Sequence, residues 1–147
     1  MDNNFDEKIL RQEKIFLKKV NTVIGSNTIF RGNFVVDGAI RIDGNYEGYV
    51  KSLDMVIIGS TAKVKGNVYG SIVIVGGKVK GDIFAVNEII LLGTSFVFGS
   101  LCSQKILIDE GARFKGKFSR VSAEEINKIF DEEVKPYIEQ EKEKWVW

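Results

Sequence analysis

The apolar and polar positions of the chain repeat with a period of about 17 residues. In each copy a glycine has an apolar or aromatic side chain two positions before it and another two positions after it. The six glycines are Gly32, Gly48, Gly66, Gly81, Gly99 and Gly116. The residues before them are Phe30, Tyr46, Val64, Val79, Val97 and Phe114; those after them are Phe34, Val50, Val68, Ile83, Leu101 and Phe118. Only 44% of the chain is hydrophobic, so this regularity indicates a structural repeat.

A second apolar stretch lies upstream of each glycine from the second copy onward, and a turn signal follows it. The stretches are 40–42, 56–58, 72–74, 89–92 and 106–108. Each unit is therefore predicted to be strand, turn, strand. The unit is too short for a strand with a crossover helix, which needs about 30 residues. An array of hairpins would make successive copies antiparallel, so equivalent residues of successive copies would not stack on one another.

The pattern thus predicts an all-β fold, a parallel β-helix (solenoid) of about six rungs. The pattern does not settle the handedness of the coil, and a right-handed parallel β-helix is favoured. The unequal spacing of the glycines does not fit the strict six-residue period of left-handed coils. At the repeated glycine we expect a positive φ or a close backbone approach, where the chain bends between faces.

Glycine placement divides the chain into three segments. All 15 glycines lie between Gly25 and Gly116, and the single proline, Pro136, lies outside that range. We therefore predict a β-helix core at 22–119, an N-terminal extension at 1–21 and a C-terminal extension at 120–147.

The N-terminal extension has apolar residues at helical spacing, among them Phe5, Ile9 and Phe16, with lysines close by. Two interpretations stand equal: an amphipathic helix on a membrane surface, or a helix packed on a partner or on the rod.

The C-terminal extension is predicted to be helical. Ser122 and Glu125 fit a capping box, and Pro136 should kink or end the helix. Trp145 and Trp147 form either an anchor or part of a tail that rests on the protein's own surface.

Composition narrows the function. The chain has no His, which removes the commonest general base and metal ligand. The core acids are scattered, so we expect no enzyme activity, no cofactor and no metal site. A net charge of +1 argues against a nucleic-acid partner. The single Cys, the short apolar runs and the acidic start predict a cytoplasmic protein without a disulfide framework, membrane span or signal peptide.

The core resembles the bactofilins, bacterial polymer-forming cytoskeletal proteins. The matching segments read TVIGSNTIFRGNF (22–34), IRIDGNYEGYV (40–50) and VIIGSTAKVKGNVYG (56–70), and the glycine-rich end at 111–118 closes the series. The resemblance implies a right-handed parallel β-helix that polymerises end to end without nucleotide. It also implies a scaffold at the inner membrane, peripheral to its cytoplasmic face, that supports cell shape or places cell-wall synthesis or remodelling proteins. The implied partners are the chain itself, inner membrane lipid and those cell-wall proteins.

The two ends of such a rod are the candidate polymer interface, because open strand edges recruit other chains. The N-terminal end offers Ile24, Ile29, Phe30 and Phe34; the C-terminal end offers Ile108, Phe114 and Phe118. The alternative is that the extensions fold back as caps over one or both ends.

Basic residues alternate with the inward side chains beside the glycines and should share an outer face. This basic stripe consists of Lys63, Lys65, Lys78, Lys80, Arg113 and Lys115, with Arg31 in the first rung; Glu47, Phe96 and Phe98 interrupt it. It is either a solvated face that blocks lateral aggregation or a docking strip for an acidic partner or anionic lipid. A non-polymerising adaptor that binds partners through its tails and this stripe is the alternative to a structural polymer.

Overall fold

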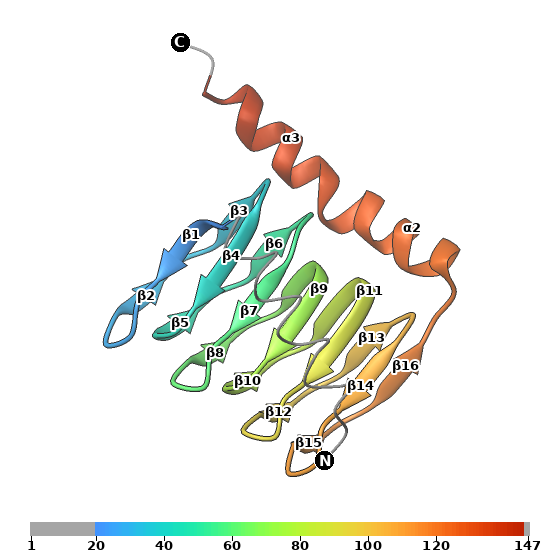
Figure 1. Ribbon diagram of the computed structural model, residues 1–147. Helices are drawn as coiled ribbons and strands as arrows, with labels where there is room; N and C mark the ends of the chain where they lie inside the picture. Colours follow the sequence, from blue (N-terminus) through green and yellow to red (C-terminus); the bar gives the residue numbers. More distant parts are fainter. Residues whose placement is uncertain (1–19, 146–147) are drawn as a thin grey trace.

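Residues 20–145 of the computed structural model are described here, and they form a parallel β-helix followed by two α-helices (Figure 1). Each rung of the β-helix places short strands on three successive faces. Face 1 carries β1 (Val20–Ile24), β4 (Ala39–Ile42), β7 (Val56–Ile58), the second part of β9 (Val68–Val75), the second part of β11 (Ile83–Leu91) and β14 (Ile106–Ile108). Face 2 carries β2 (Ile29–Arg31), β5 (Asn45–Glu47), β8 (Lys63–Lys65), β10 (Lys78–Lys80), β12 (Phe96–Phe98) and β15 (Arg113–Lys115). Face 3 carries β3 (Phe34–Val36), β6 (Val50–Ser52), the first parts of β9 and β11, β13 (Leu101–Ser103) and β16 (Phe118–Arg120).

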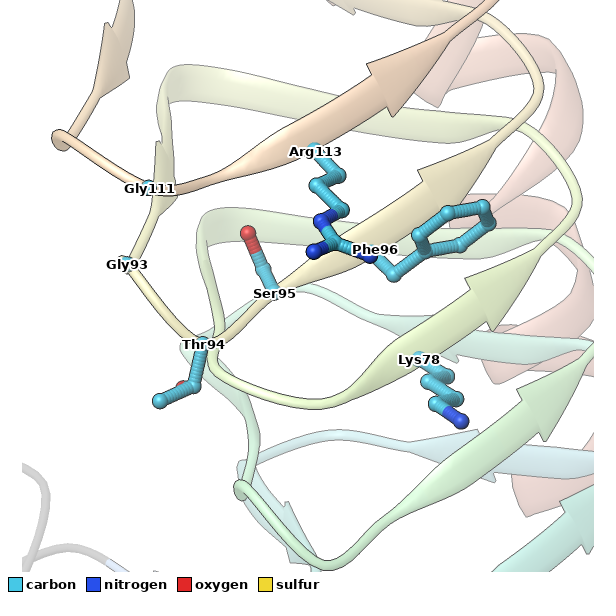
Figure 2. Close-up of a pocket in the computed structure, with 7 residues that line it drawn as sticks. All are labelled: Lys78, Gly93, Thr94, Ser95, Phe96, Gly111 and Arg113. Carbon is cyan, nitrogen blue, oxygen red and sulfur yellow. The ribbon is translucent and has the colours of Figure 1, made fainter.

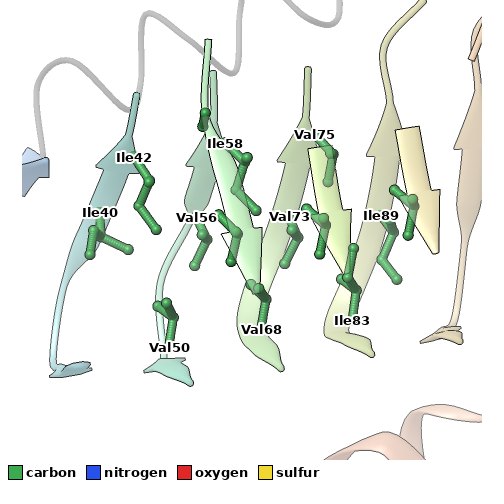
Figure 3. Close-up of a cluster of buried hydrophobic side chains, with 14 of the residues drawn as sticks. Ile40, Ile42, Val50, Val56, Ile58, Val68, Val73, Val75, Ile83 and Ile89 are labelled. Carbon is green, nitrogen blue, oxygen red and sulfur yellow. The ribbon is translucent and has the colours of Figure 1, made fainter. Parts of the chain in front are cut away.

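Every strand pairs in parallel with its equivalent in the next rung, so equivalent side chains stack in columns. Ile40, Val56, Val73 and Ile89 form one such column, and none of these side chains has exposed area (Figure 3). Because β side chains alternate, one side of each face fills the interior. The β-helix of about six rungs predicted from the sequence is confirmed.

The structure differs from the predicted unit in having three strands per rung rather than two. The repeated glycine does not lie within a strand but at the corner between faces 2 and 3. Gly66 has a φ of 145°, and a Cβ added there would lie 1.9 Å from the carbonyl oxygen of Gly48 in the rung below. The corner therefore requires glycine for both of the expected reasons, a positive φ and a close approach of two backbones.

The polar residue after the glycine links successive rungs. Asn67 Oδ1 accepts a hydrogen bond from the Asp82 backbone N–H at 3.0 Å, and Asp82 Oδ1 accepts one from the Ser100 N–H at 2.9 Å. These bonds satisfy backbone donors at a corner where the sheet ladder is interrupted.

The C-terminal extension forms α2 (Ala123–Glu133) and α3 (Lys135–Glu143). The side chain of Ser122 accepts a hydrogen bond from the Glu125 N–H at 3.2 Å, which confirms the predicted start. The helix breaks at Val134, and Pro136 lies in the first turn of α3, where proline is tolerated. The predicted interruption at Pro136 is therefore also confirmed.

Both helices pack along the outer surface of face 3 (Figure 1). The buried helix residues Ile126 and Phe130 form one cluster with Tyr69 and Cys102 of the β-helix. At the far end of α3, Lys142 pairs with Asp37 of the first rung. The helical tail thus rests on the protein's own surface, while Trp145 is 66% exposed.

Candidate self-assembly interface

An aromatic cluster forms the N-terminal end of the rod. Phe30 and Phe34 come from β2 and β3. The glycine corner between these strands brings the centres of their rings to 4.9 Å from each other. The Phe30 ring stacks on Tyr46 of the next rung at 5.5 Å, with 4° between the ring planes. The Tyr46 hydroxyl donates a hydrogen bond to the Tyr49 carbonyl at 2.7 Å and accepts one from the Phe34 N–H at 3.1 Å.

Burial raises the pKa of Tyr46 to about 12, although the hydrogen bond from Phe34 opposes that shift. The phenol therefore stays protonated at neutral pH and keeps both hydrogen bonds. The fixed aromatic ring of Tyr46 supports Phe30 and Phe34 of the first rung.

The C-terminal end of the rod is more open. The rings of Phe114 and Phe118 lie 4.5 Å apart, and Phe118 is 52% exposed. Ile108, the last residue of its inward column, is 45% exposed. The end strands β14, β15 and β16 pair only with β11, β12 and β13 among the described strands. Their outer backbone groups form an edge able to pair with another chain.

The structure brings most of the predicted interface residues to the two ends, with two differences. Phe30 and Phe34 terminate interior columns in register with Tyr46 and Val50. Ile24 is only 6% exposed, so it offers little surface to a partner. Ile29 is 75% exposed and points outward on face 2, where it contributes to the rim.

The described part of the C-terminal extension lies along the side of the rod and not over an end (Figure 1). Its main contacts with the β-helix are between α2 and β11 and between α3 and β3. The alternative that this extension caps an end is therefore wrong for its described part, because its apolar stripe packs on the outer surface of face 3. The proposed membrane-contact residues Phe5, Ile9 and Phe16 lie outside the described residues.

The basic stripe occupies the outer surface of face 2. Lys63, Lys78, Phe96 and Arg113 stand in register in one column, and Figure 2 shows the last three of these on successive strands. The parallel column holds Lys65, Lys80, Phe98 and Lys115. Every residue of both columns is exposed.

The lysines of β8 and β10 stand on successive rungs, about 4.8 Å apart along the backbone, so this part of the face attracts anionic groups. Phe96 and Phe98 are 39% and 46% exposed, and they border a groove that is also lined by lysines of β8 and β10. The Lys115 Nζ lies 5.8 Å from the centre of the Phe98 ring.

Sequence reasoning missed a buried lysine beneath the helices. Lys51 is 5% exposed, and its Nζ lies 3.4 Å from the centre of the Tyr137 ring and 4.0 Å from Glu133 Oε2. Burial lowers the pKa of Lys51, while the charge of Glu133 acts in the opposite direction. The signal in the sequence was a lysine in a column that also holds Val35, Tyr69 and Phe84.

Within residues 20–145 no group of three or more Cys, Asp or Glu side chains could hold a metal ion. In the same part of the chain no helix is long and apolar enough to cross a membrane.

Comparison with known proteins agrees with this architecture. A family model described as "Bactofilin: Polymer-forming cytoskeletal" matches residues 22–119. Bactofilin BacO of Myxococcus xanthus is 30% identical over 96 residues, which cover 65% of this chain and 76% of that protein. Bactofilin BacP of the same organism is 29% identical over 97 residues, 66% of this chain but only 40% of BacP.

The cytoskeletal bactofilin BacA, solved by solid-state NMR, superposes with a TM-score of 0.61 at 28% identity; the match covers 70% of this chain and 97% of BacA. The repeated glycine corners, the six parallel rungs and these matches lead to one conclusion: the chain belongs to the bactofilin family of polymer-forming cytoskeletal proteins.

Proposed function

We propose that this chain assembles end to end into filaments that need no nucleotide. The observation that carries the proposal is that, within residues 20–145, the strands at both ends of the rod pair on one side only and place aromatic residues in the interior columns. A joint between two ends would pair the free edges and cover Phe118 and Ile108. Burying each of these side chains contributes about 1.5–3 kcal/mol before the cost of association. Backbone pairing and apolar burial supply the contact, so no nucleotide takes part.

The filament would act as a structural scaffold and not as a catalyst. Its place would be the cytoplasmic face of the inner membrane, where it supports cell shape or localises cell-wall synthesis or remodelling proteins. The bactofilin fold and the amphipathic pattern around Phe5, Ile9 and Phe16 support this role. The exposed basic stripe offers a contact for anionic lipid or an acidic protein.

The test of end-to-end assembly is the double variant Phe114→Arg, Phe118→Arg. Two buried or half-buried cations at the joint would carry a large desolvation cost, so the variant should remain a folded monomer. Filaments are measured by negative-stain electron microscopy and sedimentation, and folding by far-UV circular dichroism. Phe96→Arg is the matched control, because this exposed aromatic lies on face 2 and its loss should leave filaments intact. Filaments of normal length in the double variant contradict the proposal.

A non-polymerising adaptor is the second candidate, favoured by the exposed lysines and phenylalanines of face 2. Charge reversal at Lys63, Lys65, Lys78 and Lys80 should abolish binding to a labelled poly-glutamate peptide in an anisotropy titration. Binding that survives the reversal counts against a docking role for the stripe. Wild-type protein that stays monomeric at every concentration would favour the adaptor over the polymer.

A further inference from the structure

The outer surface of face 1 is apolar, although the inner side of the same face already forms the core. Ile57, Ile74, Ile90 and Leu107 stand in register on β7, β9, β11 and β14. Their neighbours along each strand, such as Val56, belong to the interior cluster. Since side chains alternate along a strand, this second column points away from the interior.

These outward side chains are nevertheless buried. Ile74 and Ile90 have no exposed area, and Ile57 is 3% exposed. Among residues 20–145, their cluster contains only residues of face 1 and its flanking turns, including Ala39 and Met55. The described helices α2 and α3 pack in a different cluster, on face 3. The outer surface of face 1 therefore has the properties of a covered surface, like that of face 3 beneath its helices.

We infer that residues 1–19 of the same chain dock on the outer surface of face 1. Val20, the residue that follows this segment, begins β1 on face 1 and packs at the edge of the cluster. The segment carries apolar residues at helical spacing, among them Phe5, Ile9 and Phe16.

The lengths also match. A helix of 19 residues is about 28 Å long. Six rungs spaced about 4.8 Å apart extend over about 24 Å. A segment that starts at the first rung can therefore cover the column as far as Leu107 in the last rung.

Docking on face 1 uses the same apolar side chains that a membrane surface would take. Docking on face 1 and binding to lipid would therefore compete for the segment. This inference rests on the packing of face 1 and holds whether or not the rods polymerise.

The test measures how fast a thiol on the outer surface of face 1, beneath the docked segment, reacts with a maleimide. In a Cys102→Ser background, Ile74→Cys should react about tenfold or more slowly than the exposed Lys80→Cys, because reaction requires local opening. Adding Ile9→Asp and Phe16→Asp should raise the Ile74→Cys rate at least tenfold and leave the Lys80→Cys rate unchanged. Circular dichroism of each variant confirms that the β-helix is intact.

Each outcome decides the inference. Rapid labelling of Ile74→Cys in the unaltered segment, without lipid, overturns it and leaves the segment free for a membrane. Protection that persists after Ile9→Asp and Phe16→Asp also overturns it. Mixing with an excess of chains that carry the two aspartates should not change the labelling; a rate that rises with their share would show a cover supplied by a second copy. Leu107→Cys, at the edge of the same column, replaces Ile74→Cys if the latter fails to fold.

Discussion

Replacing Gly66 by alanine tests the corner geometry on which the stacking of the rungs depends. The new Cβ would lie 1.9 Å from the carbonyl oxygen of Gly48 and 2.6 Å from its carbonyl carbon. Both atoms belong to the backbone, so neither can move aside without shifting the rung below. The φ of 145° at Gly66 adds strain for any side chain.

The magnitude follows from these two effects. A residue held in a sparsely populated backbone region costs about 1–3 kcal/mol. Inserting a methyl group into a closely packed site costs about 1–3 kcal/mol more. Gly66→Ala should therefore lower the free energy of unfolding by about 2–6 kcal/mol, a large fraction of the stability of a single domain.

The assay is guanidinium unfolding followed by far-UV circular dichroism, at protein concentrations below those that support assembly. Gly76→Ala is the matched control, because its Cβ would meet the nearest atom, Leu92 Cδ1, at 3.4 Å and its φ is not restricted to glycine. The control should lose less than about 1 kcal/mol. Equal unfolding midpoints for Gly66→Ala and Gly76→Ala would refute the argument that the glycine corners set the spacing of the rungs.

Three further predictions concern the buried groups. Between pH 10 and 12 the free energy of unfolding of the wild type should fall by about 2 kcal/mol relative to that of Tyr46→Phe, as measured by urea titration. The reason is that the folded phenol keeps its proton up to a pKa of about 12, while the unfolded phenol loses it near 10.0. A constant difference across that range contradicts the burial of Tyr46. The lowered pKa of Lys51 changes stability with pH in the opposite direction. The free energy of unfolding of the wild type should rise relative to that of Lys51→Met as the pH increases from that lowered pKa toward 10.5. A fall over this range would show that the ammonium is not desolvated. Phe130→Ala should lower the free energy of unfolding by about 3–5 kcal/mol and speed hydrogen exchange throughout α2. Replacing the exposed Phe96 by alanine should have little effect on either quantity. Unchanged exchange in α2 would argue against its docking on face 3.

The stacking of the rungs could be predicted from the sequence because alternating side chains in parallel rungs must form columns. The column that contains Val64 and Val79 is visible in the sequence because each residue stands two before a glycine. The third face was missed because β2 and β3 have three residues each, and the glycine corner between them resembles a residue within one strand. Only the backbone φ distinguishes the two cases.

The surfaces that cover the rod were harder to predict. The continuous apolar runs at 72–75 and 89–92 carry side chains on both sides of a strand, which is typical of strands buried on both faces. The helical pattern around Ile126 and Phe130 was correctly interpreted as a helix, but its partner surface includes Lys51, whose burial depends on aromatic residues far away in the sequence.

Electron cryomicroscopy of filaments formed by the full chain tests most directly whether rods join through their open ends. Strands should lie across the filament axis, with a spacing of about 4.8 Å that continues through each joint. The rings of Phe114 and Phe118 should be buried at a joint between two rods. Filaments in which the rods associate through face 2 or face 3 while both ends stay exposed to solvent would contradict this account.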